Sequence, residues 1–114
     1  MNMIEKLNAF GADAAEGISR CCGSEALYLR LVRMIPEEKG FDALQAAIEA
    51  NDLDGGFTAA HTLKGVLGNL SLTPMYEIAS DMTELLRVHA QTDYTAMLRA
   101  LLTKRDELAL ICKE

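Results

Sequence analysis

Aromatic residues and proline are scarce in this chain of 114 residues, which holds no tryptophan, three tyrosines, three phenylalanines and two prolines. So few aromatic rings disfavour a stacking platform for nucleic acid. The scarcity of proline, with frequent leucine, alanine, methionine, glutamate and lysine, favours helices. No apolar run approaches the roughly 20 residues that span a bilayer, and the acidic start does not resemble a signal peptide. We therefore expect a helical cytoplasmic protein that does not enter a membrane.

Cysteines are also few: Cys21, Cys22 and Cys112. Their odd number and the absence of a C-x-x-C spacing argue against a disulfide framework or a zinc motif. We expect them to be buried or half-buried small side chains in a reducing compartment. The pattern does not assign them a further role.

Basic residues are outnumbered, since 11 lysines and arginines face 17 acidic residues and the formal net charge is −6. An acidic chain repels the phosphate backbone of nucleic acids and favours partners with basic surfaces. The length suits one domain with one core, spanning residues 1–114.

Glycines, prolines and capping residues divide the chain into helical segments. A glycine-bracketed connector, from Gly17 to Gly23, follows the first of these segments. The expected helices cover about residues 2–15, 25–35, 36–50, 54–70, 73–89 and 93–112. Short turns join the last four, which makes consecutive helices antiparallel neighbours. The predicted fold is all-α: an up-down-up-down four-helix bundle with an additional N-terminal helix or helices across one end.

The helix expected over residues 54–70 carries an unusual exposed face. With His61 set at zero on a helical wheel, an ordinary apolar stripe lies within roughly 60° of the opposite pole. That stripe consists of Ala59, Leu63, Val66, Leu67 and Leu70. His61 points away from it, with Lys64, Gly65 and Gly68 at positions i+3, i+4 and i+7. Phe57 and Leu72 are expected to flank the same side.

Two glycines within a helix are costly, at about 1 kcal/mol each relative to alanine. Gly65 and Gly68 leave the imidazole of His61 uncovered and allow another molecule's backbone to approach. Imidazole can form covalent intermediates as a nucleophile, and Lys64 can offset negative charge on an attached phosphoryl group. Phosphoryl transfer requires mainly positioning and charge stabilisation. The face is therefore a candidate phosphoryl acceptor, although an inert surface histidine remains the alternative from the wheel alone.

The string Ala60-His61-Thr62-Leu63-Lys64-Gly65, continued by Val66-Leu67-Gly68-Asn69-Leu70, resembles the signature of histidine-containing phosphotransfer (HPt) domains. The family pattern is, loosely, A-H-x-L-K-G followed by small residues and a glycine. Gly23 to Tyr28 resembles the family's lead-in to its second helix, and Leu44 to Asp52 resembles the helix before the histidine. The likeness covers about residues 5–105.

This resemblance implies a relay function in two-component signalling. His61 would accept a phosphoryl group from a receiver-domain aspartyl phosphate and pass it to another receiver aspartate. Lys64 would stabilise its charge, and the partner-binding surface would comprise Phe57, Gly65, Gly68, Asn69 and Leu72.

The implied partners are receiver domains of response regulators and of hybrid histidine kinases. The receiver would supply Mg²⁺, so the chain would be a phosphocarrier, not an enzyme, with no cofactor or metal of its own. We expect a monomer, because one accessible histidine serves the relay. Two alternatives stay open: a receiver-binding adaptor without chemistry, and a substrate domain that a histidine kinase phosphorylates in trans.

Two positions depart from the family pattern. Ser71 stands where glycine is frequent, and we expect little consequence. Thr83 stands where many members have a glutamate, which we interpret as a helix-surface position, with Glu84 next in sequence. His89 is expected near a helix end, where it interacts with the helix dipole. A metal site shared by His61 and His89 is disfavoured by their spacing.

Overall fold

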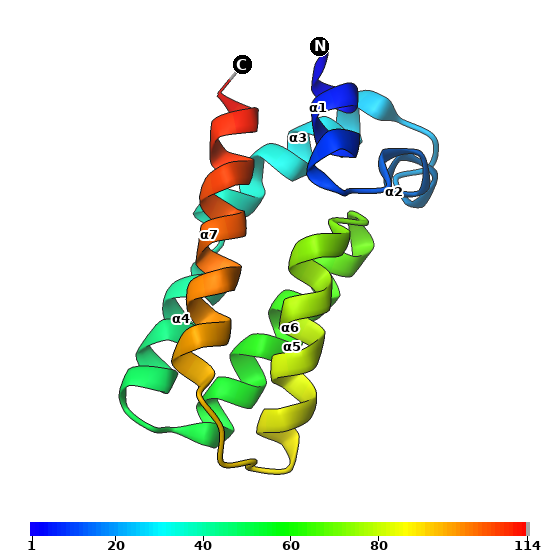
Figure 1. Cartoon of the computed structure of the whole chain (residues 1–114). Coiled ribbons are helices and arrows are strands. Elements are labelled where there is room, and N and C mark those ends of the chain that lie inside the picture. Colours follow the sequence, from blue (N-terminus) through cyan, green and yellow to red (C-terminus); the bar gives the residue numbers. More distant parts are fainter. Residues whose placement is uncertain (114) are drawn as a thin grey trace.

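The structure, a computed structural model, describes residues 1–113. This part of the chain is all-helical, with no strand (Figure 1). The helices are α1 (Met3–Phe10), α2 (Ala14–Arg20), α3 (Glu25–Met34), the 3₁₀ turn η1 (Ile35–Glu37), α4 (Lys39–Glu49), α5 (Leu53–Asn69), α6 (Thr73–Arg87) and α7 (Tyr94–Cys112). None of the described helices is long and apolar enough to cross a membrane.

Helices α4 to α7 form the predicted up-down-up-down bundle. Each packs against the next along the chain, and α7 returns to contact α4 (Figure 1). Helix α7 is long enough to extend past the bundle, and it also contacts α1, α3 and η1. The short N-terminal helices α1 to α3 therefore cover one end of the bundle, as the sequence predicts.

Local capping explains why most helices begin where they do. The side chains of Ser24, Asp52 and Asp93 each accept a hydrogen bond from a backbone N–H in the first turn of the helix that follows. These bonds satisfy amide groups that have no partner within the helix. Pro36 lies within η1, where its fixed φ angle suits the start of a helical turn. The boundaries of α3 to α7 consequently agree with the sequence prediction to within a few residues.

The prediction of one N-terminal helix over residues 2–15 is wrong. Helix α1 ends at Phe10 because Gly11 adopts φ +114°, a left-handed conformation that closes a helix end. Asp13 then caps a separate helix, α2, by accepting a hydrogen bond from the N–H of Glu16 at 3.1 Å. Gly17 lies within α2 and is not part of a connector.

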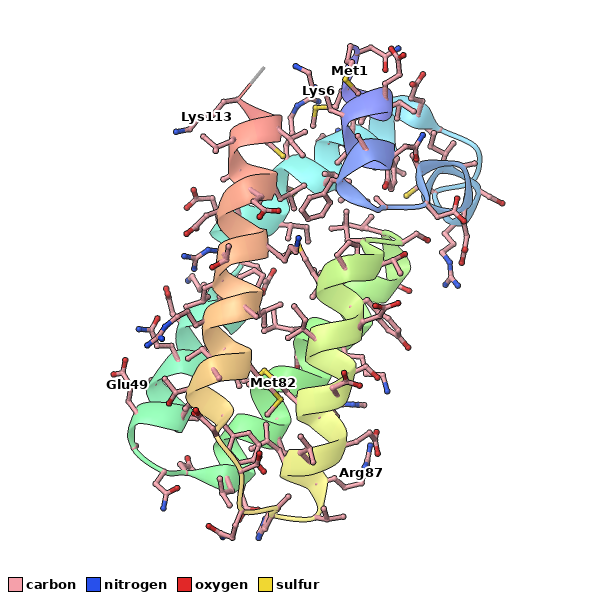
Figure 2. All side chains as sticks on the ribbon, in the orientation of Figure 1. Met1, Lys6, Glu49, Met82, Arg87 and Lys113 are labelled. Carbon is pink, nitrogen blue, oxygen red and sulfur yellow. The ribbon has the colours of Figure 1, made fainter. Side chains whose placement is uncertain are left out.

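A single core runs along the bundle axis and continues under the N-terminal helices. Its largest fully buried side chains include Tyr28 of α3, Phe41 of α4, Leu63 of α5 and Met82 of α6. Figure 2 shows Met82 directed between the helices and Arg87 projecting from the outside of α6. Burial of these apolar groups, at roughly 25 cal/mol per Å² removed from water, is the main force that holds the bundle together.

The N-terminal helices are fixed to the turn that joins α5 to α6. The Tyr28 hydroxyl donates a hydrogen bond to the Leu70 carbonyl at 2.9 Å, and the Asp13 N–H donates to the Ser71 carbonyl at 3.0 Å. A Cβ atom at Gly17 would meet both the Tyr28 ring and the Leu70 carbonyl oxygen. Glycine at this position therefore allows α2 to lie close against the turn.

The cysteines are free thiols. Cys21 is buried and Cys112 is half-buried, as predicted, and burial raises the pKa of the Cys112 thiol. Cys22 is exposed, at φ +58°, so the prediction is wrong for this residue.

Candidate functional site

His61 lies in the middle of α5 and is exposed to solvent. The opposite face of α5 buries Ala59, Leu63 and Leu67 in the core, which fixes the rotation of the helix and directs position 61 outward. No hydrogen bond joins the His61 ring to another group in residues 1–113. Its nitrogens are therefore free to meet a partner molecule.

An aromatic stack supports one face of the His61 ring. The ring centroids of His61 and Phe57 are 5.7 Å apart, and the ring planes differ by only 10°. The two residues are four apart on α5, so the helix itself places them one above the other. Arg87 of α6 lies with its guanidinium carbon 4.9 Å from the centre of the Phe57 ring, a cation–π arrangement. The imidazole is thus supported by packing from two helices.

Three charged groups lie on the α5 and α6 surfaces around this stack. The Lys64 ammonium nitrogen is 3.9 Å from a carboxylate oxygen of Glu84. The same carboxylate group is 3.4 Å from the Arg87 guanidinium. Lys64 is half-buried, whereas Glu84 and Arg87 are exposed. Two cations therefore share one carboxylate beside His61, which leaves a net positive charge for an arriving anion.

Gly65 and Gly68, which follow His61 on α5, differ in the space that surrounds each of them. A Cβ atom at Gly65 would meet nothing within 4 Å, so no contact in the described structure requires glycine there. A Cβ at Gly68 would lie 3.1 Å from two carbons of the Tyr76 ring. Gly68 therefore accommodates Tyr76 of α6, while Gly65 leaves bare backbone facing solvent.

A hollow of about 520 Å³ opens beside His61. Residues of three helices and of the α5–α6 turn line it: Glu16, Arg20, His61, Lys64, Gly65, Gly68, Asn69, Ser71, Thr73 and Tyr76. Asn69 is exposed on its wall, close to the end of α5. The structure thus brings Lys64, Gly65, Gly68 and Asn69 together around one depression next to the imidazole.

The family model described as the Hpt domain matches residues 31–110, which include the whole of α4, α5 and α6 and most of α7. The chain belongs to the Hpt domain family. No curated protein and no solved structure matches it in the corresponding comparisons. Hpt domains are phosphotransfer modules of two-component signalling. The match leaves out residues 1–30, which form α1, α2 and the first part of α3 in this Hpt domain.

One predicted partner-binding residue, Leu72, does not lie on the exposed face. It is fully buried, and its carbonyl accepts hydrogen bonds from the N–H groups of Met75 and Tyr76 in the first turn of α6. The helical wheel places position 72 outward only if α5 continues to that residue. The helix ends at Asn69, however, and the chain then turns at Ser71, which directs Leu72 into the core.

The structure buries both residues that depart from the family pattern. Ser71 adopts φ +52°, a conformation that favours glycine, and its hydroxyl is buried without a hydrogen-bond partner among the described residues. The prediction that Thr83 is a surface position is wrong: it is fully buried, and its hydroxyl donates to the Ala79 carbonyl at 2.7 Å. The adjacent Glu84 is the surface carboxylate, and it pairs with Lys64.

His89 follows the end of α6, as expected, and its ring also pairs with the side chain of another helix. A ring nitrogen of His89 lies 2.8 Å from a carboxylate oxygen of Asp54, in the first turn of α5. Among residues 1–113, no group of three or more histidine, cysteine and acidic side chains could hold a metal ion.

Sequence reasoning missed the roles of Arg87, Glu16 and Arg20 around His61. The spacing of Glu84 and Arg87 on one helix face indicates that they can pair. No signal within the sequence shows that α2 lies against the α5–α6 turn, because those contacts join segments more than about fifty residues apart.

Proposed function

We propose that this Hpt domain is a phosphorelay intermediate in which His61 accepts a phosphoryl group from a receiver-domain aspartyl phosphate and passes it to another receiver aspartate. The observation that carries the proposal is the exposed imidazole at mid-helix, beside the bare backbone of Gly65. A protein surface can approach this ring closely, and the ring has no hydrogen bond within residues 1–113 to give up.

The transfer is a displacement at phosphorus. A lone pair on a ring nitrogen of neutral His61 forms the P–N bond while the P–O bond to the receiver aspartate breaks, and the aspartate leaves as a carboxylate. The proton on the other ring nitrogen remains on the phosphoimidazole, or passes to solvent and is regained before the ring leaves in the reverse step. The reverse displacement, by a second aspartate, regenerates neutral His61. Atoms and charge balance in both directions, so the chain acts as a carrier.

Neighbouring residues supply position and charge. Phe57 holds the plane of the His61 ring by stacking at 5.7 Å, which limits the orientations the nucleophile can take. Lys64 can turn from Glu84 toward the phosphoryl oxygens, because the pair is partly solvated and weakly held at 3.9 Å. In this proposal the receiver supplies Mg²⁺ and the remaining catalytic groups, and the chain acts as a cytoplasmic monomer.

The test is phosphoryl transfer with a matched pair of histidine variants. The chain is incubated with Mg²⁺ and radiolabelled phosphorylated receiver domains, including those encoded beside its gene. We expect acid-labile label on the wild type and on His89→Gln, and none on His61→Gln. His89 is the only other histidine in the chain, so it controls for non-specific labelling.

Other outcomes separate the alternatives. Equal receiver binding by wild type and His61→Gln, without transfer to either, would establish an adaptor. Labelling of His61 only from ATP and a histidine kinase would establish a substrate domain instead.

A further inference from the structure

The N-terminal helix α2 forms one side of the hollow beside His61, although it lies outside the residues that match the family. Glu16 and Arg20 of α2 line the same depression as Lys64 and Gly65 of α5. In Figure 1, α2 lies just beyond the turn that joins α5 to α6. A protein docked over His61 would therefore meet α2 as well as the bundle.

Helix α2 is held in place before any partner arrives. The Asp13 N–H, immediately before α2, donates to the Ser71 carbonyl at 3.0 Å. Gly17 lies against both the Tyr28 ring and the Leu70 carbonyl, and it is buried. Because α2 is fixed at both of these points, a partner cannot push it aside without disrupting buried contacts. The helix can therefore discriminate between partner surfaces.

The hollow offers hydrogen-bond donors of two cations to a docked molecule, beside the carboxylate of Glu16. Arg20 donates through two nitrogens to one oxygen of Glu16, at 2.9 and 3.0 Å, so its remaining N–H groups are left for a second acceptor. About half of the Arg20 side chain is exposed. Lys64 adds a second cation to the lining, and the buried Ser71 hydroxyl has no partner among the described residues.

The geometry points to a specificity surface in which Arg20 receives an acidic side chain of the receiver, next to that receiver's phosphorylated aspartate. This inference rests on the proposed function, since it concerns the partner of the same site. The hollow includes His61, and its lining carries two cations, Arg20 and Lys64, against one carboxylate, Glu16. The excess of one positive charge favours a carboxylate on the docked molecule. The chain as a whole carries a net charge of −6 and repels an acidic group at long range, so such a group needs local cations like Arg20 and Lys64 to bind. Residues 1–30 would thereby contribute to the choice of receiver.

The experiment compares Arg20→Glu and Arg20→Gln with Arg99→Glu. Arg99 is an exposed arginine that lines a separate groove between α4 and α7, so Arg99→Glu makes the same change in net charge away from the hollow. Each full-length variant receives phosphoryl groups from a panel of acetyl-phosphate-treated receiver domains. Phosphoramidate, a small donor that needs no docking, reports the intrinsic reactivity of His61.

We expect Arg20→Glu to slow transfer from the preferred receiver at least tenfold and to alter the order of preference among receivers. Arg20→Gln should slow it about threefold, and Arg99→Glu should remain within twofold of wild type. Labelling by phosphoramidate should stay within about twofold of wild type, and the thermal midpoint should fall only by the few degrees that the loss of the exposed Arg20–Glu16 pair costs. Unchanged receiver preference in both Arg20 variants would overturn this inference and leave the proposed function intact. No transfer to the wild type from any receiver would overturn both.

Discussion

The ammonium nitrogen of Lys64 lies 3.9 Å from a carboxylate oxygen of Glu84, and that carboxylate also pairs with Arg87. Lys64 is one helical turn from His61, within reach of a phosphoryl group on the imidazole. Glu84 and an arriving phosphoryl group would therefore compete for the same cation. A carrier benefits from such competition, because a group held too tightly is not passed on.

Replacing Glu84 by glutamine should shift the transfer equilibrium toward phosphorylated His61 by about two- to fivefold, the scale of a surface ion pair. The measurement is the ratio of labelled chain to labelled receiver at equilibrium. Glu77→Gln, an exposed glutamate on the same helix, is the control and should leave the ratio unchanged. A lower ratio in Glu84→Gln would show that this carboxylate positions Lys64 instead of competing for it.

Phosphoryl transfer should tolerate a small side chain at position 65 but not a large one, whereas the fold should tolerate both. Because a Cβ atom there has open space, Gly65→Ala should raise the free energy of unfolding by about 1 kcal/mol through helix propensity. Gly65→Gln should also fold, yet slow transfer from a receiver more than tenfold by blocking its approach. Urea unfolding and transfer rates give the two quantities.

Gly68→Ala provides the contrast, because the new Cβ would press on the Tyr76 ring at 3.1 Å. Its gain in unfolding free energy should be smaller than that of Gly65→Ala, or reversed. Equal gains at both positions would contradict the packing described for Tyr76.

Ser71→Gly should stabilise the protein by about 1–2 kcal/mol. The substitution relieves a non-glycine residue at φ +52° and removes a buried hydroxyl that has no partner among the described residues. Cys22→Gly, at φ +58° on the surface, relieves only the backbone and should gain less. Chemical denaturation of both variants at neutral pH makes the comparison. A loss of stability in Ser71→Gly would mean that the hydroxyl is hydrogen-bonded in solution.

Tyr28 should make stability depend on pH in the alkaline range. Burial raises the pKa of its phenol to about 12, with smaller contributions from Cys21 and Asp13. The folded state thus holds this proton more tightly than the unfolded chain. The stabilisation is complete below about pH 10 and is lost as the pH rises toward 12.

Tyr28→Phe isolates this contribution. At neutral pH the variant should lose about 1–2 kcal/mol, because the Leu70 carbonyl loses its hydrogen-bond donor. Between about pH 9 and pH 11, the unfolding free energy of the wild type should fall by roughly 1 kcal/mol more than that of the variant. Urea unfolding at both pH values measures the difference, and parallel declines would contradict the raised pKa.

By itself, the sequence determined those features that depend on residues three or four apart. The capping side chains of Ser24, Asp52 and Asp93 fix where three helices begin. The spacing of apolar residues along α5 predicts that His61 points away from the core. These signals are local, because a helix closes its hydrogen bonds and forms its faces within one turn. The four-helix bundle followed from amphipathic segments joined by short turns.

Tertiary structure alone decided what lies beyond a helix end or across to another helix. The turn at Ser71 sent Leu72 into the core, and packing buried Thr83 while leaving Glu84 to reach Lys64. The hydrogen bond from Tyr28 to Leu70, 42 residues away, helped to fix the N-terminal helices at the end of the bundle that holds the α5–α6 turn. Contacts of this kind depend on how complete helices pack, and their geometry is not encoded in the spacing of neighbouring residues.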